Sequence, residues 1–248
     1  MDTNKIYSEI RKWCEDNSDL KIVLKYSRYF KEGFDAHGLD TKLLEIEFVK
    51  WKEKYLNKMK FDDAKKLCEL LYASGKYDES GIAVKIFKLY DNEYRKRDLK
   101  IIKNWLDKYA STWAHTDVMS WEVIVLFFRK GIIKFTDFKS WRESKSIWTR
   151  RAVPVSFIKI ICDERITSLI DFIKPMIIDK DKPVQQGLGW FLREVWKKEP
   201  KITGKFLLEI KNTAPRTIIQ YATEKMEKSE KLKYKAGKKI SKNEFKNL

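Results

Sequence analysis

The sequence predicts an all-α protein, an α-solenoid in which antiparallel helix pairs stack side by side, and three observations predict it. Glycine and proline are scarce, at 9 and 5 of 248 residues, whereas sheet proteins need many tight turns that use both. Apolar residues recur at helical spacing along most of the chain. The predicted helices also alternate, since residues 115–130 are apolar around most of the circumference and 183–197 are amphipathic. Such alternation is typical of HEAT or armadillo repeats, with a compact orthogonal bundle as the alternative.

The first part of the chain is predicted to form seven helices joined by short polar links. Apolar residues stand at helical spacing in the first helix, as at Ile10 and Trp13. Residues 33–40 are predicted to be a loop, and Asp40 or Thr41 can cap the helix that follows through its side-chain oxygen. The predicted helices are 4–14, 20–30, 42–55, 61–74, 80–90, 99–108 and 115–130.

Six further helices are predicted in the second part of the chain. Pro183 and Pro215 stand where the first turn of a helix tolerates proline. Gly187 and Gly189 lie inside a predicted helix, where each costs about 1 kcal/mol relative to alanine. We expect close approach of another backbone to be the reason for them. The predicted helices are 134–140, 147–162, 166–177, 183–197, 204–212 and 215–228.

The basic charge is spread over an expected single domain, residues 1–228, and an expected basic tail, residues 229–248. The formal net charge is +17, and residues 225–248 hold nine Lys against three Glu. The tail has little apolar periodicity and is predicted to be frayed or disordered. The rest of the chain still carries a net +11, because 17 − 6 = 11. This charge favours a polyanionic partner such as DNA, RNA or an anionic membrane, with merely solvated lysines as the alternative.

Several classes of protein are disfavoured by what the sequence lacks. No run of 18 apolar residues is present, and the N-terminus does not resemble a secretory signal, so a membrane protein or a secreted protein is not expected. Three widely spaced cysteines and two histidines favour reduced thiols in a cytosol and disfavour a zinc site. No Rossmann, P-loop or hydrolase-elbow motif occurs.

Two pairs of residues stand near the starts of predicted helices. Trp113 and Asp117 are four apart and share a helix face, so the carboxylate can stabilise a developing positive charge beside an indole. A helix-capping role for Asp117 is the alternative, and His115 is expected to face away as a surface or capping residue. Arg151, which follows Trp148, can hold a phosphate together with backbone N–H groups, with a surface ion pair as the alternative.

Two further pairs are candidates for contacts with a ligand. Trp190 and Arg193 are three apart and project on neighbouring parts of one helix face. Tyr26 and Arg28 form a weaker fourth pair, because an aromatic residue at helical spacing usually lies in the core.

At these residues the sequence resembles the AlkD-type DNA alkylation repair glycosylases over about residues 20–228. The resemblance implies tandem HEAT-like helix pairs around a basic concave groove. The family often has another Trp and another Asp around the first motif, where this chain has Thr112 and Ala114. The motifs that carry the resemblance are W-x-x-x-D at 113–117, W-x-x-R-A at 148–152 and G-W-x-L-R-E at 189–194.

The resemblance also implies the roles of individual residues. Asp117 matches the catalytic carboxylate. The aromatic residues that flank the lesion are Trp113, Trp190 and Tyr26, and the arginines that contact the DNA backbone are Arg151, Arg193, Arg28 and Arg216.

The resemblance implies a DNA glycosylase that excises N3- or N7-alkylated purines, such as 3-methyladenine and 7-methylguanine, from duplex DNA in base excision repair. The lesion would be gripped through its backbone and not enclosed. At an effective dielectric near 20, a carboxylate about 4 Å from a unit charge contributes about 4 kcal/mol, or about 10³ in rate. We expect a cytoplasmic, nucleoid-associated monomer that needs no cofactor and no metal and does not bind membranes.

Three other functions stay open at this point. A non-catalytic HEAT-repeat protein would bind nucleic acid through the same groove. A protein–protein scaffold would carry lysines that are merely solvated, and a membrane-surface protein would use the basic tail.

Overall fold

Helices are the only regular elements in residues 1–236, the part of the chain that the structure, a computed structural model, describes. The predicted all-α fold is therefore confirmed. The described chain divides into two compact units, the first being Met1–Ile160 and the second beginning at Ile161. The prediction of a single domain over residues 1–228 stays a prediction. None of the helices in residues 1–236 combines the length and the apolar character needed to cross a membrane.

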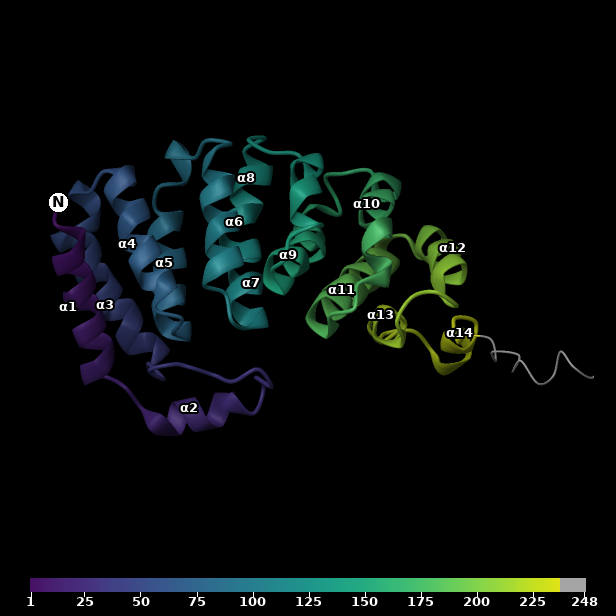
Figure 1. Cartoon of the computed structure of the whole chain (residues 1–248), viewed down its shortest axis with the longest axis horizontal. Helices are drawn as coiled ribbons and strands as arrows, with labels where there is room; N and C mark the ends of the chain where they lie inside the picture. Colours follow the sequence, from purple (N-terminus) through teal and green to yellow (C-terminus); the bar gives the residue numbers. More distant parts are fainter. Residues whose placement is uncertain (237–248) are drawn as a thin grey trace, which may run out of the picture. The chain divides into compact units, whose positions relative to one another are not determined.

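The first unit is a row of helices packed side by side (Figure 1). In this row α1 packs on α4, α4 on α5, α5 on α7, and α7 on α9. A short turn at residues 74–76 joins α4 to α5, which makes them an antiparallel pair. The helices are α1 (Thr3–Asp16), α2 (Leu20–Ser27), α3 (Thr41–Lys54), α4 (Phe61–Ala73), α5 (Tyr77–Lys88), α6 (Asp98–Lys108), α7 (Trp113–Met119), α8 (Val125–Arg129) and α9 (Ile147–Phe157). Short 3₁₀ turns connect them at η1 (Leu56–Lys58), η2 (Asp91–Glu93), η4 (Phe135–Trp141) and η5 (Ile158–Ile160).

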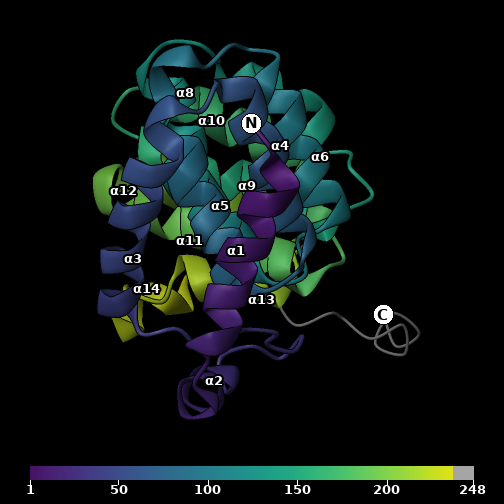
Figure 2. The same cartoon turned by 90° about the vertical axis from the view of Figure 1, so that its left-hand side faces the viewer.

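Helix starts in this unit follow the local sequence. Asp2, Asp19 and Asp40 each precede a helix, and each side chain accepts a hydrogen bond from a backbone N–H of the first turn. The predicted cap at Asp40 is confirmed by its contacts with the amides of Lys42 and Leu43, at 2.9 and 3.0 Å. Figure 2 views the unit from the side of α1, which lies alongside α4 and α5.

The predicted helix at residues 115–130 is one continuous helical run with an irregularity in its middle. It consists of α7, a π-helical turn η3 (Ser120–Ile124) and α8. The prediction that it is buried on most sides is confirmed, since Met119, Val123, Ile124 and Phe127 are all shielded from solvent. A π turn shifts the register of the side chains that follow it, and such turns are frequent beside functional sites.

Helix α2 is shorter than the sequence predicts. It ends at Ser27 where helical spacing predicts Phe30, and it lies crosswise to the helices of the row (Figure 1). None of its residues is fully buried. Phe30 leaves the helix and stacks on Trp113, 5.0 Å between ring centroids. We attribute the early end to this tertiary contact, which overrides local helical spacing.

The second unit holds the remaining described helices, with a core that includes Val184, Leu188, Phe191, Leu207 and Ile218. Helix α11 packs on both α12 and α13. The elements are α10 (Ile166–Ile173), the 3₁₀ turn η6 (Lys174–Ile178), α11 (Lys182–Lys198), α12 (Pro200–Ile210), α13 (Arg216–Ala222) and α14 (Lys228–Leu232).

The predicted helix 215–228 is wrong in its second half, because the chain breaks after Ala222. The Thr223 N–H still donates to the Ile219 carbonyl at 3.0 Å, but the next amide, that of Glu224, donates to the Tyr221 carbonyl three residues back at 3.3 Å, which is a 3₁₀-type bond that closes the last turn. Glu227 is extended, and the separate helix α14 follows it.

The start of the expected tail is folded onto the second unit. Residues 229–232 belong to α14, and Tyr234 is buried, 4% exposed. A Cβ atom on Gly204 of α12 would lie 2.9 Å from the Tyr234 Oη, so this ring packs against the glycine. The rest of the expected tail, residues 237–248, lies outside the described residues.

Gly189 is a position where α11 and α13 of the second unit approach closely. A Cβ atom there would lie 2.5 Å from the Tyr221 Cβ and 2.8 Å from the Ile218 carbonyl oxygen, which confirms the predicted close approach. We expect Gly189→Ala to lower the free energy of unfolding by about 1–3 kcal/mol, because α11 and α13 must separate. Urea unfolding measures the change.

The matched control is Gly81→Ala in α5, where a Cβ atom would meet nothing within 4 Å. This variant is expected to be as stable as the parent or up to about 1 kcal/mol more stable, since alanine is the better helix former. Equal effects at the two positions would show that the approach at Gly189 is not what matters.

Candidate functional site

Two of the sequence motifs meet where α7 packs against α9. Asp117 of α7 accepts two hydrogen bonds from Arg151 of α9, at Oδ1 from Nε and at Oδ2 from Nη2, each 2.8 Å long. One residue before, the Thr116 hydroxyl donates to the Trp148 carbonyl at 3.4 Å. The W-x-x-x-D and W-x-x-R-A segments therefore form one side-by-side assembly, fixed by a bidentate ion pair.

This ion pair is almost completely withdrawn from solvent. Asp117 is 8% exposed and Arg151 is 5% exposed. Burial raises the pKa of the Asp117 carboxyl, and the charge and hydrogen bonds of Arg151 oppose that rise. Asp117 is thus a nearly enclosed carboxylate with both oxygens fixed by Arg151.

The contacts of Arg151 bear on its expected role. The sequence predicts that Arg151 contacts a phosphate, with a surface ion pair as the alternative. In the structure two of its guanidinium nitrogens contact Asp117, and the ion pair is buried and not at the surface. A phosphate contact by Arg151 stays a prediction, whereas its hold on Asp117 is direct.

His115 closes the N-terminus of α7. Its Nδ1 lies 3.3 Å from the Thr112 backbone nitrogen, as part of a capping box. The expected capping role is confirmed, but the ring is 3% exposed and is not a surface residue. Burial lowers the pKa of His115 to about 4, so the ring is neutral at physiological pH. The Thr112 that departs from the usual family pattern is thus the N-cap of the helix that carries Asp117.

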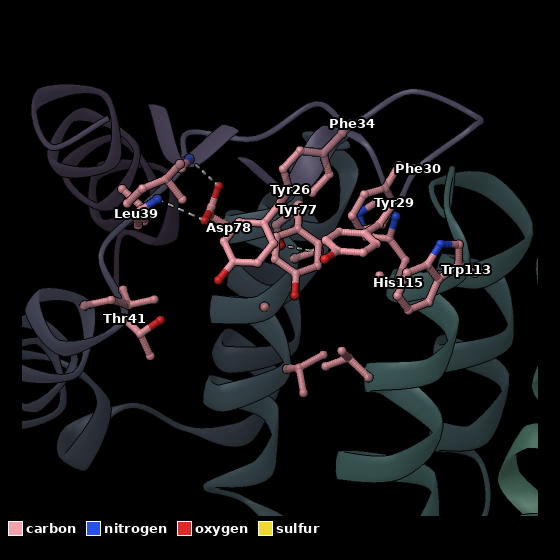
Figure 3. A pocket seen from close by; sticks show the side chains of 18 of the residues that line it. Tyr26, Tyr29, Phe30, Phe34, Leu39, Thr41, Tyr77, Asp78, Trp113 and His115 are labelled. Atoms are coloured by element: carbon pink, nitrogen blue, oxygen red, sulfur yellow. Dashed lines mark hydrogen bonds between the residues drawn. The ribbon is translucent and has the colours of Figure 1, made fainter. Parts of the chain in front are cut away.

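A cavity of about 650 Å³ lies beside α7 in the first unit, and Trp113 forms part of its wall (Figure 3). Tyr26 lines the same cavity and is 44% exposed. The structure therefore brings together two of the three expected lesion-flanking aromatics. The other Phe and Tyr rings in the wall are Tyr29, Phe30, Phe34, Tyr72 and Tyr77.

One face of the Trp113 indole is already covered. Phe30 stacks on it nearly in parallel, at 7° and 5.0 Å between centroids, and Phe34 stacks on Phe30 at 4.4 Å. Aromatic stacking of this kind is worth about 0.5–1.5 kcal/mol beyond burial and fixes ring orientation. A ligand can therefore reach Trp113 only on its other face or its edge.

The wall that carries these rings is tied to the start of α5. Asp78 accepts hydrogen bonds from three successive amides of the loop, those of His37, Gly38 and Leu39, at 2.6, 3.1 and 3.3 Å. The His37 Nε2 also lies 2.8 Å from the Oε1 of Glu79, which is fully buried. These contacts hold the loop that positions Phe34.

Gly38 is required by the conformation of this loop. Its φ is +76°, and a Cβ atom would lie 2.4 Å from the Asp19 carbonyl oxygen. Only glycine combines a positive φ with so close an approach at low cost.

Most of this aromatic wall is not indicated by the sequence pattern. Helical spacing places Phe30 in a helix, and the motifs do not include Phe34, Tyr77 or Asp78. The available signal was the pair of phenylalanines four apart that flanks Gly33 in an otherwise polar segment. Arg28 lies near the wall, where it donates to the Tyr29 hydroxyl at 2.9 Å.

The remaining candidates lie in the second unit. Trp190 and Arg193 are both on α11, and Arg193 forms ion pairs with Glu194 and with Glu224. Arg216 is exposed at the first turn of α13. Because these residues and Asp117 belong to different units, the placement of Trp190 beside Asp117 stays a prediction.

A comparison with models of protein families shows which family the chain belongs to. The model described as "DNA alkylation repair enzyme" matches residues 10–226. This chain belongs to that family. A solved structure described as a predicted DNA alkylation repair enzyme from Enterococcus faecalis superposes with a TM-score of 0.71, at 13% sequence identity. The match covers 86% of this chain and 98% of that one, and it shows the fold. No curated protein matches the chain significantly.

Membership of the DNA alkylation repair enzyme family fits the helix stacking described above and confirms the resemblance found in the sequence. In this family member, residues 1–236 hold no group of three or more His, Cys, Asp or Glu side chains able to bind a metal ion.

Proposed function

We propose that this protein is a DNA glycosylase that excises N3- or N7-alkylated purines from duplex DNA. The observation that carries the proposal is the enclosed Asp117 carboxylate, held by Arg151 and one helical turn from Trp113, in a member of the DNA alkylation repair enzyme family. A carboxylate fixed in this way suits the stabilisation of positive charge.

The reaction needs little general-acid catalysis. An N3- or N7-alkylated purine already carries a positive charge, so the base leaves as a neutral molecule with the electron pair of the glycosidic bond. Positive charge then develops on the deoxyribose, water adds at C1′, and a proton is released. Asp117 opposes that developing charge and orients the attacking water, while Arg151 keeps the carboxylate ionised and in position.

The other site residues have supporting roles in this proposal. The uncovered side of Trp113, together with Trp190 and Tyr26, attracts the cationic nucleotide, each ring contributing about 0.5–2 kcal/mol. The exposed arginines Arg28 and Arg216 contact phosphates, and Arg193 does so from its ion pairs with Glu194 and Glu224. The net charge of +17 supports a DNA partner. A monomer that acts in the cytoplasm, on the nucleoid, is part of the same proposal.

The test is release of free bases from methylated duplex DNA by the purified full-length chain. We expect 7-methylguanine and 3-methyladenine to appear in the supernatant, measured by chromatography, and uracil in a matched duplex to stay in place. DNA binding that falls with salt but releases no base would instead support the non-catalytic nucleic-acid-binding alternative.

A further inference from the structure

Helix α3 carries an apolar stripe that the rest of residues 1–236 leaves open to solvent. Leu43, Ile46 and Val49 are 42%, 59% and 54% exposed. They stand three residues apart, on successive turns of one helix. Exposed apolar residues that gather in this way, unlike single ones, mark an interaction surface. None of the three lines the cavity beside Trp113, so the stripe is separate from the candidate site.

The opposite face of α3 attaches the helix to the row. Trp51 is the buried residue of α3, and its ring packs edge-on against Trp13 of α1, 5.3 Å between ring centroids. Leu44 and Phe48 are half-buried on the same side of the helix. Figure 1 shows α3 beside α1 at the end of the row. Because one face holds the helix there, the other face is left to solvent.

The outer face has the residue spacing of a coiled-coil seam. The residues that form the seam are Lys42, Ile46, Val49 and Glu53. Successive members are four, three and four residues apart, so they follow one line along the helix. Both charged side chains are exposed, and neither forms an ion pair within residues 1–236. The seam therefore has an unpaired cation at one end, an unpaired anion at the other, and two apolar residues between them.

This order of residues is complementary to itself when two copies run antiparallel. The spacing of four, three and four reads the same in both directions, so Ile46 faces Val49 of the partner subunit. Lys42 then faces Glu53 of the partner subunit, and two-fold symmetry repeats the contact at the other end. A parallel pair would instead set like charges against each other. The seam thus selects one orientation for a second copy.

The local charge of this face favours a second copy over DNA. The chain carries a net charge of +17, and two such chains repel each other except where their surfaces are neutral and apolar. Along the seam Lys42 is balanced by Glu53. Beside it the Lys50 ammonium lies 2.8 Å from the Glu47 carboxylate. A phosphate backbone needs cations in excess, which this face does not offer.

We propose that α3 binds α3 of a second copy of this chain, antiparallel, across the stripe of Leu43, Ile46 and Val49. The inference does not rest on the proposed function. One helix of 14 residues from each copy gives a small interface. We therefore expect a weak dimer, with a Kd of about 10–100 μM. The monomer of the proposed function is the form present at lower concentration.

The experiment is sedimentation equilibrium of the full-length chain over about 1–500 μM, a range that spans the expected Kd, in about 0.15 M salt to screen the repulsion between basic chains. We expect the parent to pass from monomer to dimer. Ile46→Asp should stay monomeric throughout, because it places a carboxylate in the middle of each apolar stripe. Leu208→Asp is the matched control, since Leu208 is also an exposed apolar residue, on α12, and this variant should dimerise like the parent.

Charge reversals test the antiparallel order. Lys42→Glu and Glu53→Lys should each weaken the dimer about tenfold, because each turns two attractive contacts into like-charge contacts. The variant with both reversals restores the two contacts with their signs exchanged, and it should dimerise like the parent. Non-specific association of apolar surfaces would not respond to the charges in this way.

A parent chain that stays monomeric over the whole range would overturn the proposal and leave the stripe to a different protein. A dimer that survives Ile46→Asp, or a double reversal that does not recover, would overturn it as well. Thermal melting of every variant identifies any loss of fold, and the reversals at exposed positions keep the test decisive if Ile46→Asp unfolds. Excision by Ile46→Asp should equal that of the parent, so that the dimer and the glycosylase fail separately.

Discussion

Replacing Asp117 with asparagine is expected to lower the rate of excision of 7-methylguanine by about 10²- to 10³-fold. The full charge of a carboxylate near the reacting sugar is worth about 4 kcal/mol at an effective dielectric near 20, or about 10³ in rate. Arg151 contacts both carboxylate oxygens and screens part of that charge, so the lower end of the range is included. Single-turnover release of the base from alkylated duplex DNA measures the effect.

The loss of excision rate in Asp117→Asn should be incomplete, because alkylated purines leave readily and the aromatic residues still bind the cation.

Asp137→Asn is the matched control, since Asp137 is also an ion-paired carboxylate, 2.7 Å from the Lys96 ammonium, but lies on η4. We expect this variant to excise at the parent rate. Excision that survives the combination of Asp117→Asn with Trp190→Ala would show that the site has been assigned to the wrong residues.

Replacing Arg151 with methionine is expected to lower the free energy of unfolding at neutral pH by about 3–5 kcal/mol. The substitution leaves Asp117 buried without its partner, and an uncompensated buried charge is among the most destabilising single changes. Urea unfolding measures the loss. The control is Arg28→Met, an exposed arginine, which is expected to stay within about 0.5 kcal/mol of the parent.

The stability lost by Arg151→Met should depend on pH in a defined direction. Burial raises the pKa of Asp117, and without Arg151 nothing in the pair opposes that rise. A carboxyl whose pKa is raised by folding contributes stability below its ordinary pKa, and this contribution is lost as the pH rises through the folded value. The difference from the parent should therefore be small in acid and grow toward neutral pH. A difference that does not vary with pH would mean that Asp117 is not the source of the cost.

The rate of excision by the parent chain should also fall at acid pH. Because burial raises the pKa of Asp117, protonation should reduce the rate at a pH above the ordinary range of an aspartate. The same measurement that tests Asp117→Asn, repeated across pH, shows whether the rate falls in this way.

Much of the fold could be predicted from local sequence. The apolar spacing of residues 115–130 predicts a buried helix, Asp40 predicts a cap, and Gly189 predicts a close approach, and the structure has all three. The apolar spacing and the cap depend on interactions within one or two turns of helix. A glycine inside a helix commonly indicates that another backbone lies close. Residues that are neighbours in the sequence are therefore enough to indicate all three features.

The aromatic wall could not be predicted in this way. Phe30 and Trp113 are far apart in sequence, and helical spacing alone extends α2 to Phe30, whereas the stack with Trp113 ends it at Ser27. The buried ion pair is similar, because Arg151 at a helix start suits a phosphate as well as it suits a carboxylate. Which of these it contacts depends on which helix packs against α9.

The helical character of the chain, its strong positive charge and its three short motifs like those of the DNA alkylation repair glycosylases can all be read from the residues alone. The buried pair of Asp117 and Arg151, and the covered face of Trp113 beside an aromatic cavity, become visible in the folded chain. Periodicity, capping and charge act within a few residues, whereas burial and stacking depend on which distant helices meet.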